Sequence, residues 1–230
     1  MREKFDIVVV GGGISGCALF YELSRSGMGK VALLEAGEIA SKITGDSGGY
    51  IRKFNTDPYL AQLASESFDY YQNFEFEVGG SCDFRKTGLV SRVTADAFEG
   101  LKTQIEMLRI SGHEIFASST APTESLRKAH YGDDGHIFIY EPTLGNINTK
   151  LACRSWVNAA VRNGGAIFEN TKLDEISLRS NGSVASLRTS RGIIESEVVV
   201  MSAGAWSKEL LRSLPIDLSS ISARSFQYNI

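Results

Sequence analysis

Short apolar runs and helical repeats alternate along this chain. Residues 5–10 form a nearly continuous apolar run of strand length and residues 198–201 a continuous one, as expected for strands covered on both faces. After the first run, residues 17–25 carry apolar side chains at helical spacing, and the glycines that follow predict the end of that helix. A second apolar strand is predicted at 30–36. Residues 5–36 therefore predict a β-α-β unit and a parallel sheet.

Three more segments have the periodicity of amphipathic helices. They cover residues 57–78, 96–112 and 148–163, and two glycines end the last of them. The side chains predicted to face inward are Leu60, Leu63, Ala64, Phe68 and Tyr71 in the first, and Leu151, Trp156, Ala159 and Val161 in the last.

Strand-like segments lie between and after these helices. Residues 82–93 predict two strands or one bent strand, and residues 135–148 alternate before turning. Residues 172–201 predict three strands, with a hairpin at the Ser-Asn-Gly-Ser sequence at 180–183 and a further turn at 190–192. The middle of the chain thus looks like a β-rich insertion between two halves of a parallel α/β domain.

Composition excludes several classes of protein. The 230 residues are 43% hydrophobic and 22% charged, which is typical of globular proteins. A net charge of −3 without a basic run argues against nucleic acid or acidic membrane surfaces as partners. No apolar stretch approaches the roughly 20 residues of a membrane span. The N-terminus lacks the pattern of a secretory signal, so a cytoplasmic location is expected.

The cysteines and histidines do not predict a metal centre. Cys17, Cys82 and Cys153 are far apart and lack the spacing of zinc ligands, so each is expected to be a buried free thiol. The three histidines, at 113, 130 and 136, also lack ligand spacing. No bound metal is expected.

A nucleotide-binding motif follows the first strand. Gly11, Gly13 and Gly16 form G-x-G-x-x-G between a predicted strand and a predicted helix, where the helix N-terminus can bind a pyrophosphate. Glu35 ends the second strand about twenty residues later, where a carboxylate can accept hydrogen bonds from a ribose hydroxyl. The motif alone leaves FAD and NAD open.

Several segments resemble one family in the same order. The sequence VVVMSAGAWSKELL at 198–211 resembles the return strand of the D-amino-acid oxidase family of FAD-dependent oxidoreductases, which includes glycine oxidase and sarcosine oxidase. Residues 14–27 resemble its first helix, and SGGYIRKF at 47–54 resembles its flavin-facing segment. Residues 140–176 resemble its return crossover. The inserted β-rich region and this return strand favour FAD over an NAD-dependent dehydrogenase.

The resemblance implies an α/β fold with a Rossmann-like FAD-binding parallel sheet and a β-rich part of a substrate domain. The FAD-binding domain is expected at 1–80 and 147–215, and the partial substrate or interface domain at 81–146 and 216–230. Arg52 is expected beside the flavin or a substrate carboxylate, with Lys53 as the alternative position. The residues expected to contact the cofactor are Gly11, Gly13, Ile14, Ser15, Gly16, Glu35, Ala36, Ser41, Ser47, Gly48, Ala203 and Gly204.

The resemblance also implies chemistry and a partner. Members oxidise a C–N bond, with hydride transfer from an amine or amino acid to the flavin and an imine as product. Residues 47–50 lack the histidine that some members carry, so FAD is expected to be non-covalent. Members extend well beyond the region matched here, which predicts a second polypeptide that completes the fold in a hetero-oligomer. The alternatives are a truncated fragment, or a non-catalytic or structural nucleotide-binding subunit.

Overall fold

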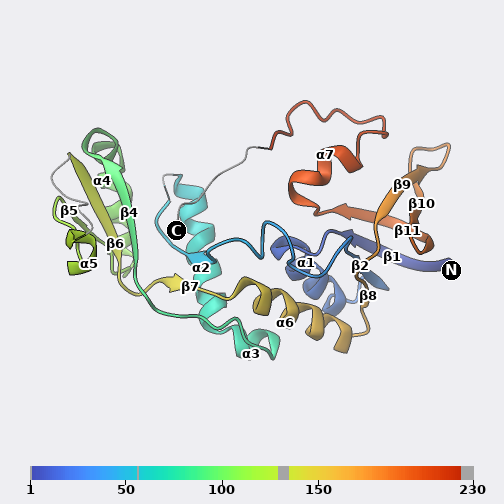
Figure 1. Ribbon diagram of the computed structural model, residues 1–230, viewed down its shortest axis with the longest axis horizontal. Helices are drawn as coiled ribbons and strands as arrows, with labels where there is room; N and C mark the ends of the chain where they lie inside the picture. Colours follow the sequence, from blue (N-terminus) through green and yellow to red (C-terminus); the bar gives the residue numbers. More distant parts are fainter. Residues whose placement is uncertain (1, 56, 129–134, 224–230) are drawn as a thin grey trace. The chain divides into compact units, whose positions relative to one another are not determined.

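The computed structural model describes residues 2–55, 57–128 and 135–223 (Figure 1). The chain divides into two compact units. Unit 1 comprises residues 1–47, 78–80 and 149–230, and unit 2 comprises residues 48–77 and 81–148. Both units are therefore built from segments that are separated in the sequence.

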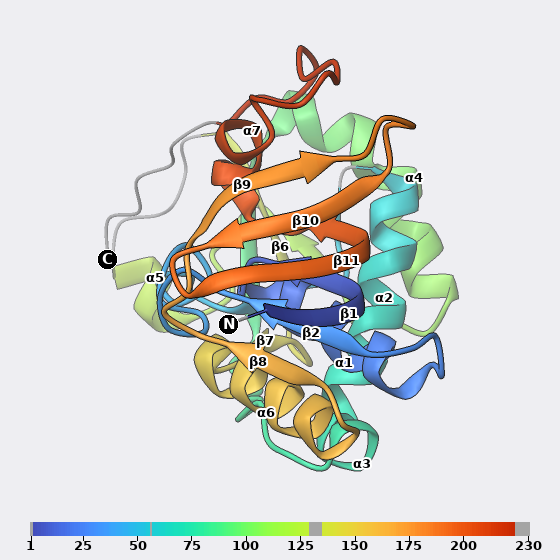
Figure 2. The same cartoon turned by 90° about the vertical axis from the view of Figure 1, so that its right-hand side faces the viewer.

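A six-stranded sheet forms the centre of unit 1, in the order β8-β2-β1-β11-β10-β9 (Figure 2). Its strands are β1 (Arg2–Val10), β2 (Val31–Leu34), β8 (Ala166–Phe168), β9 (Leu173–Leu178), β10 (Val184–Thr189) and β11 (Gly192–Met201). β1 pairs in parallel with β2 and β11, and β2 pairs in parallel with β8. β9 and β10 add an antiparallel hairpin. The predicted parallel sheet and the three final strands are confirmed.

Two helices of unit 1 pack against each other, α1 (Ile14–Arg25) and α6 (Thr149–Arg162). Trp156 and Ala159 are buried as predicted, whereas Leu151 and Val161 are exposed, so their predicted burial is wrong. The buried face of α6 instead uses small side chains, among them Ala152, Cys153 and Ala160. Small residues let helices approach closely, and here they share the buried face of α6 with Trp156 and Val157.

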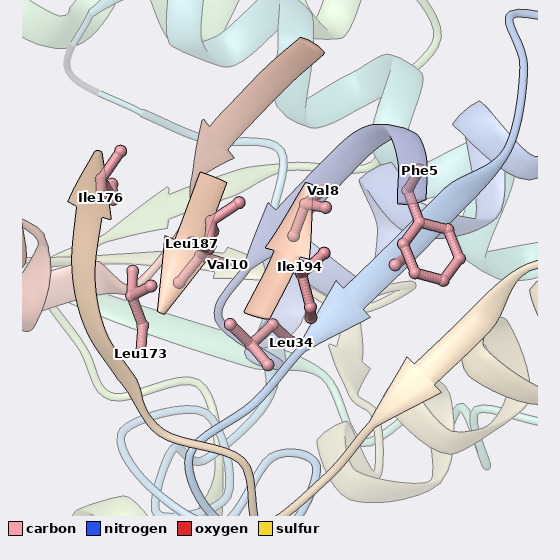
Figure 3. Close-up of a cluster of buried hydrophobic side chains, with 9 residues drawn as sticks. Phe5, Val8, Val10, Leu34, Leu173, Ile176, Leu187 and Ile194 are labelled. Atoms are coloured by element: carbon pink, nitrogen blue, oxygen red, sulfur yellow. The ribbon is translucent and has the colours of Figure 1, made fainter. Parts of the chain in front are cut away.

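A hydrophobic core of unit 1 is formed by side chains from both the parallel strands and the hairpin of this sheet. Its buried members come from five strands and are drawn in Figure 3: Phe5, Val8, Val10, Ala32, Leu34, Leu173, Ile176, Leu187 and Ile194. Leu210, Leu211 and Leu214 pack against this cluster from the segment that contains η1 (Gly204–Trp206) and α7 (Ser207–Leu210). This packing holds the ends of β1 and β2, where the motif residues begin, in fixed positions.

Unit 2 contains two small sheets. β3 (Tyr50–Ile51) pairs with β7 (Gly145–Asn146), and β6 (His136–Glu141) lies between β4 (Leu89–Thr94) and β5 (Phe116–Ser118). The helices outside unit 1 are α2 (Pro58–Gln72), α4 (Ala95–Ile110) and α5 (Glu124–Lys128), and α3 (Phe74–Val78) ends at the boundary of the units. Leu101, Ile105 and Leu108 of α4 pack with Ile139 of β6 in a second core.

The structure corrects three details in the middle of the chain. The predicted helix 57–78 is interrupted at Asn73, and Leu60 and Leu63 are exposed while Ala61 and Phe68 are buried. Residues 82–88 form no strand, apart from an isolated bridge at Arg85. Gly88 has φ +72°, a left-handed conformation that interrupts an extended chain before β4 begins.

The compact units do not follow the predicted domain boundaries. Residues 48–77, predicted within the FAD-binding domain, belong to unit 2. Residues 216–223 belong to unit 1, whereas 224–230 lie outside the described residues. The assignment of one unit to FAD and the other to substrate stays a prediction. No helix in the described ranges combines the length and apolar character needed to cross a membrane.

Candidate functional site: a glycine loop with open amide groups

The loop between β1 and α1 is folded so tightly that two positions require glycine. Gly11 has φ +111°, and a Cβ atom there would lie 2.5 Å from the carbonyl oxygen of Ser202. A Cβ atom on Gly16 would lie 1.8 Å from the carbonyl oxygen of Gly11. Both distances are far below van der Waals contact. The glycines therefore bring the first turn of α1 directly against the end of the sheet.

The N-terminus of α1 leaves several amide groups open. Gly13 is the N-cap residue and provides no side-chain cap. The Ile14 N–H donates to Thr44 Oγ1 at 3.0 Å, so it is already occupied. The N–H groups of Gly13, Ser15 and Gly16 have no hydrogen-bond partner among the described residues. Open donors at the positive end of a helix form a binding site for an anion such as a pyrophosphate.

Glu35 lies against this loop rather than simply ending β2. Its Oε2 accepts from the Gly12 N–H at 2.6 Å, and its Oε1 accepts from the Gly37 N–H at 2.8 Å. Each carboxylate oxygen can accept a further hydrogen bond, as a ribose hydroxyl would require. The carboxylate is also held in one orientation, because two backbone donors on opposite sides fix it.

The segment that follows Glu35 packs beside the glycine loop. The Ala40 N–H donates to the Gly12 carbonyl at 2.9 Å, and the Ile39 N–H donates to Glu169 Oε1 at 2.8 Å. Glu169 also binds Arg154 through two hydrogen bonds of 2.9 and 3.0 Å, and Arg154 lowers the pKa of this carboxyl. Ala36 and Ser41 are exposed on this segment. Ala36 follows Glu35 and Ser41 follows Ala40, and both Glu35 and Ala40 bond to Gly12, so Ala36 and Ser41 lie next to the glycine loop.

The return strand also reaches the loop. The Ser202 N–H donates to the Val10 carbonyl at 2.8 Å, and the Cα atom of Ala203 is 2.8 Å from the position of a Cβ on Gly11. Gly204 begins η1 directly afterwards. Ser47 is exposed at the end of a unit 1 segment, where its N–H donates to the Thr44 carbonyl. Residues from four distant parts of the sequence thus surround the open amides.

Gly48 and Arg52 belong to unit 2, and there a buried carboxylate fixes the backbone. Glu141 is 3% exposed, and its Oε1 accepts from the N–H groups of Lys53 at 3.1 Å and Phe54 at 2.9 Å. Burial raises the pKa of Glu141, although these two donors and the charge of Arg52 act in the opposite direction. The segment 50–54 is further held by the pairing of β3 with β7.

The side chains of Arg52 and Lys53 have different environments. Lys53 is only 12% exposed, with Nζ 3.8 Å from Asp69 Oδ1, 3.3 Å from His113 Nδ1 and 4.3 Å from the centre of the Phe68 ring. Burial lowers the pKa of Lys53. Arg52 is exposed, and no described residue forms a hydrogen bond or salt bridge with its side chain. Lys53 thus anchors the segment, and Arg52 is the cation available to a ligand.

The other sulfur and imidazole groups do not form a second site. The cysteines are all free and buried, as predicted. His113 contacts Ser65 and Lys53, His136 contacts Arg92, and His130 lies outside the described residues. Residues 2–55, 57–128 and 135–223 contain no group of three or more side chains arranged to hold a metal ion.

The glycine loop fits FAD, because open N–H donors suit its pyrophosphate and a fixed carboxylate suits its ribose. Sequence reasoning missed three residues that shape this loop, namely Gly12, Thr44 and Ser202. Gly12 lies inside the motif at an unconstrained position. Thr44 and Ser202 act through long-range contacts, and no local spacing predicts these.

Comparisons with known proteins support the same interpretation. Mouse (Mus musculus) mitochondrial sarcosine dehydrogenase is 27% identical over 213 residues, which is 90% of this chain and 23% of that protein. The mitochondrial pyruvate dehydrogenase phosphatase regulatory subunit of mouse is 27% identical over 214 residues, 91% of this chain and 24% of that protein. The L-proline dehydrogenase structure from P. horikoshii has a TM-score of 0.77 and 25% identity, covering 92% of this chain and 56% of that chain.

The chain therefore spans about a quarter of two curated relatives and just over half of a solved one. The family model described as DAO, FAD dependent oxidoreductase, matches residues 6–228, nearly the whole chain. The motif, the sheet that carries it and this match agree: the chain belongs to the DAO family of FAD-dependent oxidoreductases.

Proposed function

We propose that this chain provides the FAD-binding part of an oxidoreductase that acts on an amine or amino acid. The observation that carries the proposal is the set of open N–H groups at Gly13, Ser15 and Gly16, beside the fixed carboxylate of Glu35. When bound, FAD accepts a hydride from the carbon next to the substrate nitrogen. The protein's own residues bind the cofactor, orient the substrate and keep both in place.

FAD is proposed to be held without a covalent bond. Cys17 and Cys153 are fully buried in unit 1 and Cys82 is buried in unit 2, so their thiols are not presented to a ligand. Residues 47–50 are Ser-Gly-Gly-Tyr and offer no imidazole. Acid precipitation of the protein should therefore leave all the flavin in the supernatant, whereas flavin in the pellet would contradict this proposal.

Arg52 is proposed to bind a carboxylate of the substrate or to favour negative charge on the reduced flavin. The Arg52 side chain is exposed. The backbone next to it is held in place because the Lys53 N–H donates to Glu141 and the Lys53 side chain lies near Asp69. A charge-assisted hydrogen bond contributes about 1.5–3 kcal/mol. Arg52→Met should therefore lower kcat/KM for an amino acid by roughly 10- to 100-fold. Arg85→Met is the matched control, since Arg85 is also exposed in unit 2 and its side chain forms a salt bridge with Asp83.

The relatives contain residues beyond the region that this chain matches. We propose that a second polypeptide supplies the equivalent residues and forms a hetero-oligomer with this chain. This chain covers 56% of the solved relative and about a quarter of the two curated relatives. We propose that the product of a neighbouring gene supplies these residues. The test is co-expression, followed by an assay of amines and amino acids with an artificial electron acceptor. Turnover by the complex alone supports the proposal, and equal turnover by the isolated chain contradicts it.

A non-catalytic role is the second candidate function. One relative of similar identity is named as the regulatory subunit of a phosphatase, so a likeness at this level is compatible with a chain that regulates another enzyme. The two functions differ in one readout. A non-catalytic subunit would bind FAD or remain empty, and Arg52→Met would leave the activity of its complex unchanged.

A further inference from the structure

In unit 2, both ring nitrogens of His113 make contacts that link Lys53 to helix α2. The Nδ1 atom lies 3.3 Å from Lys53 Nζ, and the Nε2 atom lies 3.2 Å from Ser65 Oγ. Ser65 belongs to α2, and its hydroxyl donates to the Ala61 carbonyl at 2.9 Å. The His113 N–H donates to the Leu108 carbonyl at 3.0 Å, which holds the loop after α4 and the ring with it.

The two ring contacts require the same form of the imidazole. A lysine ammonium has donors only, so Nδ1 of His113 must accept from Lys53 and carries no proton. The hydroxyl hydrogen of Ser65 is used on the Ala61 carbonyl, so Ser65 Oγ must accept from an Nε2–H group. Both ends of the chain of hydrogen bonds therefore specify a neutral ring with its proton on Nε2. A protonated ring would direct an N–H group at the Lys53 ammonium.

The charged groups around the ring favour this neutral form. Burial and the positive charge of Lys53 lower the pKa of His113 below its ordinary value of 6.5, and Asp69 of α2 acts in the opposite direction. Asp69 is largely exposed, and Glu141 of β6 acts on Lys53. Arg109, at the end of α4, donates to a carbonyl further along the chain. His113 is therefore neutral at pH 7 and gains a proton as the pH falls below 6.5.

Lys53 connects this ring to Arg52, the neighbouring residue in the chain. We infer that neutral His113 is a positioning residue: it holds the Lys53 side chain, and thereby keeps Arg52 in place for a carboxylate of the substrate. Protonation of His113 replaces an acceptor with a donor of like charge, so Lys53 loses this contact and Arg52 is no longer held. This inference rests on the proposed function, which assigns Arg52 to the substrate.

NMR of the imidazole nitrogens in the wild-type chain tests the form of the ring, without any substrate or cofactor. At pH 7 the signals of His113 should be those of a neutral ring with its proton on Nε2, and the ring should titrate below pH 6.5. The signals that disappear in His113→Asn identify this ring among the three histidines. A ring that carries a proton on Nδ1 at pH 7 would overturn the inference.

The pH dependence of KM for an amino acid tests the positioning role, measured on the complex formed by co-expression. The substrate carboxylate keeps its charge between about pH 5 and 7, so a change in KM over this range reports on the protein. From pH 7 to pH 5, KM of the wild type should rise about fivefold or more, whereas kcat should change less.

Variants separate His113 from other groups that titrate. His113→Asn provides an acceptor oxygen near the position of Nδ1 and does not titrate, so its KM should stay low at both pH values. His113→Leu has no acceptor, so its KM should be high at both. His136→Asn is the matched control, because the Nδ1 of His136 lies 3.2 Å from an Arg92 nitrogen in the same unit, and it should keep the wild-type profile.

The outcomes separate this inference from the proposed function. If KM of His113→Asn rises at low pH as in the wild type, the positioning role is overturned and the proposed function stands. Arg52→Met should lose the pH dependence of KM, and a variant that kept it would also overturn the role, because His113 would then act by another route. A wild-type complex without turnover would overturn the proposed function and the positioning role together.

Discussion

Two backbone segments of this chain bring several N–H groups close together. In one segment these groups have an acceptor within the protein, and in the other some of them have none among the described residues. In unit 2, the buried carboxylate of Glu141 fills the donors of Lys53 and Phe54. In unit 1, Glu35 takes the Gly12 and Gly37 donors but leaves those of Gly13, Ser15 and Gly16 open. This contrast distinguishes a segment that only supports the fold from one that can bind a ligand. Donors satisfied inside the protein fix a segment, whereas oriented donors without a partner are available to a ligand.

The largest effect is expected from closing the glycine loop. Gly16→Ala would place a Cβ atom 1.8 Å from the Gly11 carbonyl oxygen, so α1 would have to move away from the sheet. The free energy of unfolding should fall by about 3 kcal/mol or more, and FAD binding should be lost. Urea denaturation and the flavin content of the purified protein measure the two effects.

Gly100→Ala is the control for that variant. Gly100 is also helical, in α4, and a Cβ atom there meets no other atom within 4 Å. The same substitution should therefore stabilise the protein by about 0.5–1 kcal/mol. Equal effects of the two substitutions would contradict the close approach at Gly16.

The next largest effect should come from removing the carboxylate that accepts from the Lys53 and Phe54 N–H groups. Glu141→Ala leaves the N–H groups of Lys53 and Phe54 without an acceptor, and each buried unpaired donor costs about 1–3 kcal/mol. The variant should lose about 2–4 kcal/mol of stability in urea denaturation. Glu141→Gln keeps an acceptor oxygen and should recover most of the loss. If the two variants were equally unstable, the acceptor role of Glu141 would be refuted.

A smaller effect, confined to the cofactor, is expected at Glu35. Glu35→Gln keeps the size of the side chain but replaces one acceptor oxygen with an NH2 group, which cannot accept from Gly12 or Gly37. The affinity for FAD should fall by roughly 10- to 100-fold, the value of one hydrogen bond to a charged group. Titration of the apoprotein by flavin fluorescence measures it. An unchanged affinity would remove Glu35 from the site.

The smallest effect is expected at the pair formed by Arg154 and Glu169. Because Arg154 lowers the pKa of Glu169, the pair contributes stability above the ordinary pKa of 4.5, and this contribution is lost as the pH falls through the folded pKa. The pair is partly exposed, so Arg154→Met should cost about 1 kcal/mol or less at pH 7.

At pH 3, the stabilities of Arg154→Met and the wild type should converge. Urea denaturation at both pH values makes the comparison. A difference that grows as the pH falls would reverse the assigned direction of the pKa shift.

Patterns of local sequence predicted the elements around the glycine loop well. The strands and the helix at 5–36, the hairpin after residue 172 and the apolar final strand are all present. These elements depend on apolar runs, glycine positions and turn residues that are close in sequence. The glycine motif and Glu35 follow from the same short-range order.

The buried faces of the helices were predicted less well. Leu60, Leu63, Leu151 and Val161 have helical periodicity but are exposed. Which face a helix buries depends on its neighbours, and α6, which packs on α1, buries several small residues that periodicity does not single out. Thr44 and Glu141 were missed for the same reason, because their partners lie 30 and about 88 residues away.

An absorbance spectrum from 300 to 550 nm tests most directly whether the open N–H groups of Gly13, Ser15 and Gly16 bind FAD. It should be recorded for the wild type and for Gly16→Ala, each purified alone and after co-expression with the product of the neighbouring gene. If the open N–H groups bind FAD, the wild type should have a flavin spectrum, at least in the complex, Gly16→Ala should have none, and Gly100→Ala should equal the wild type. A wild type without flavin in either preparation, or a Gly16→Ala variant with full flavin content, would contradict it.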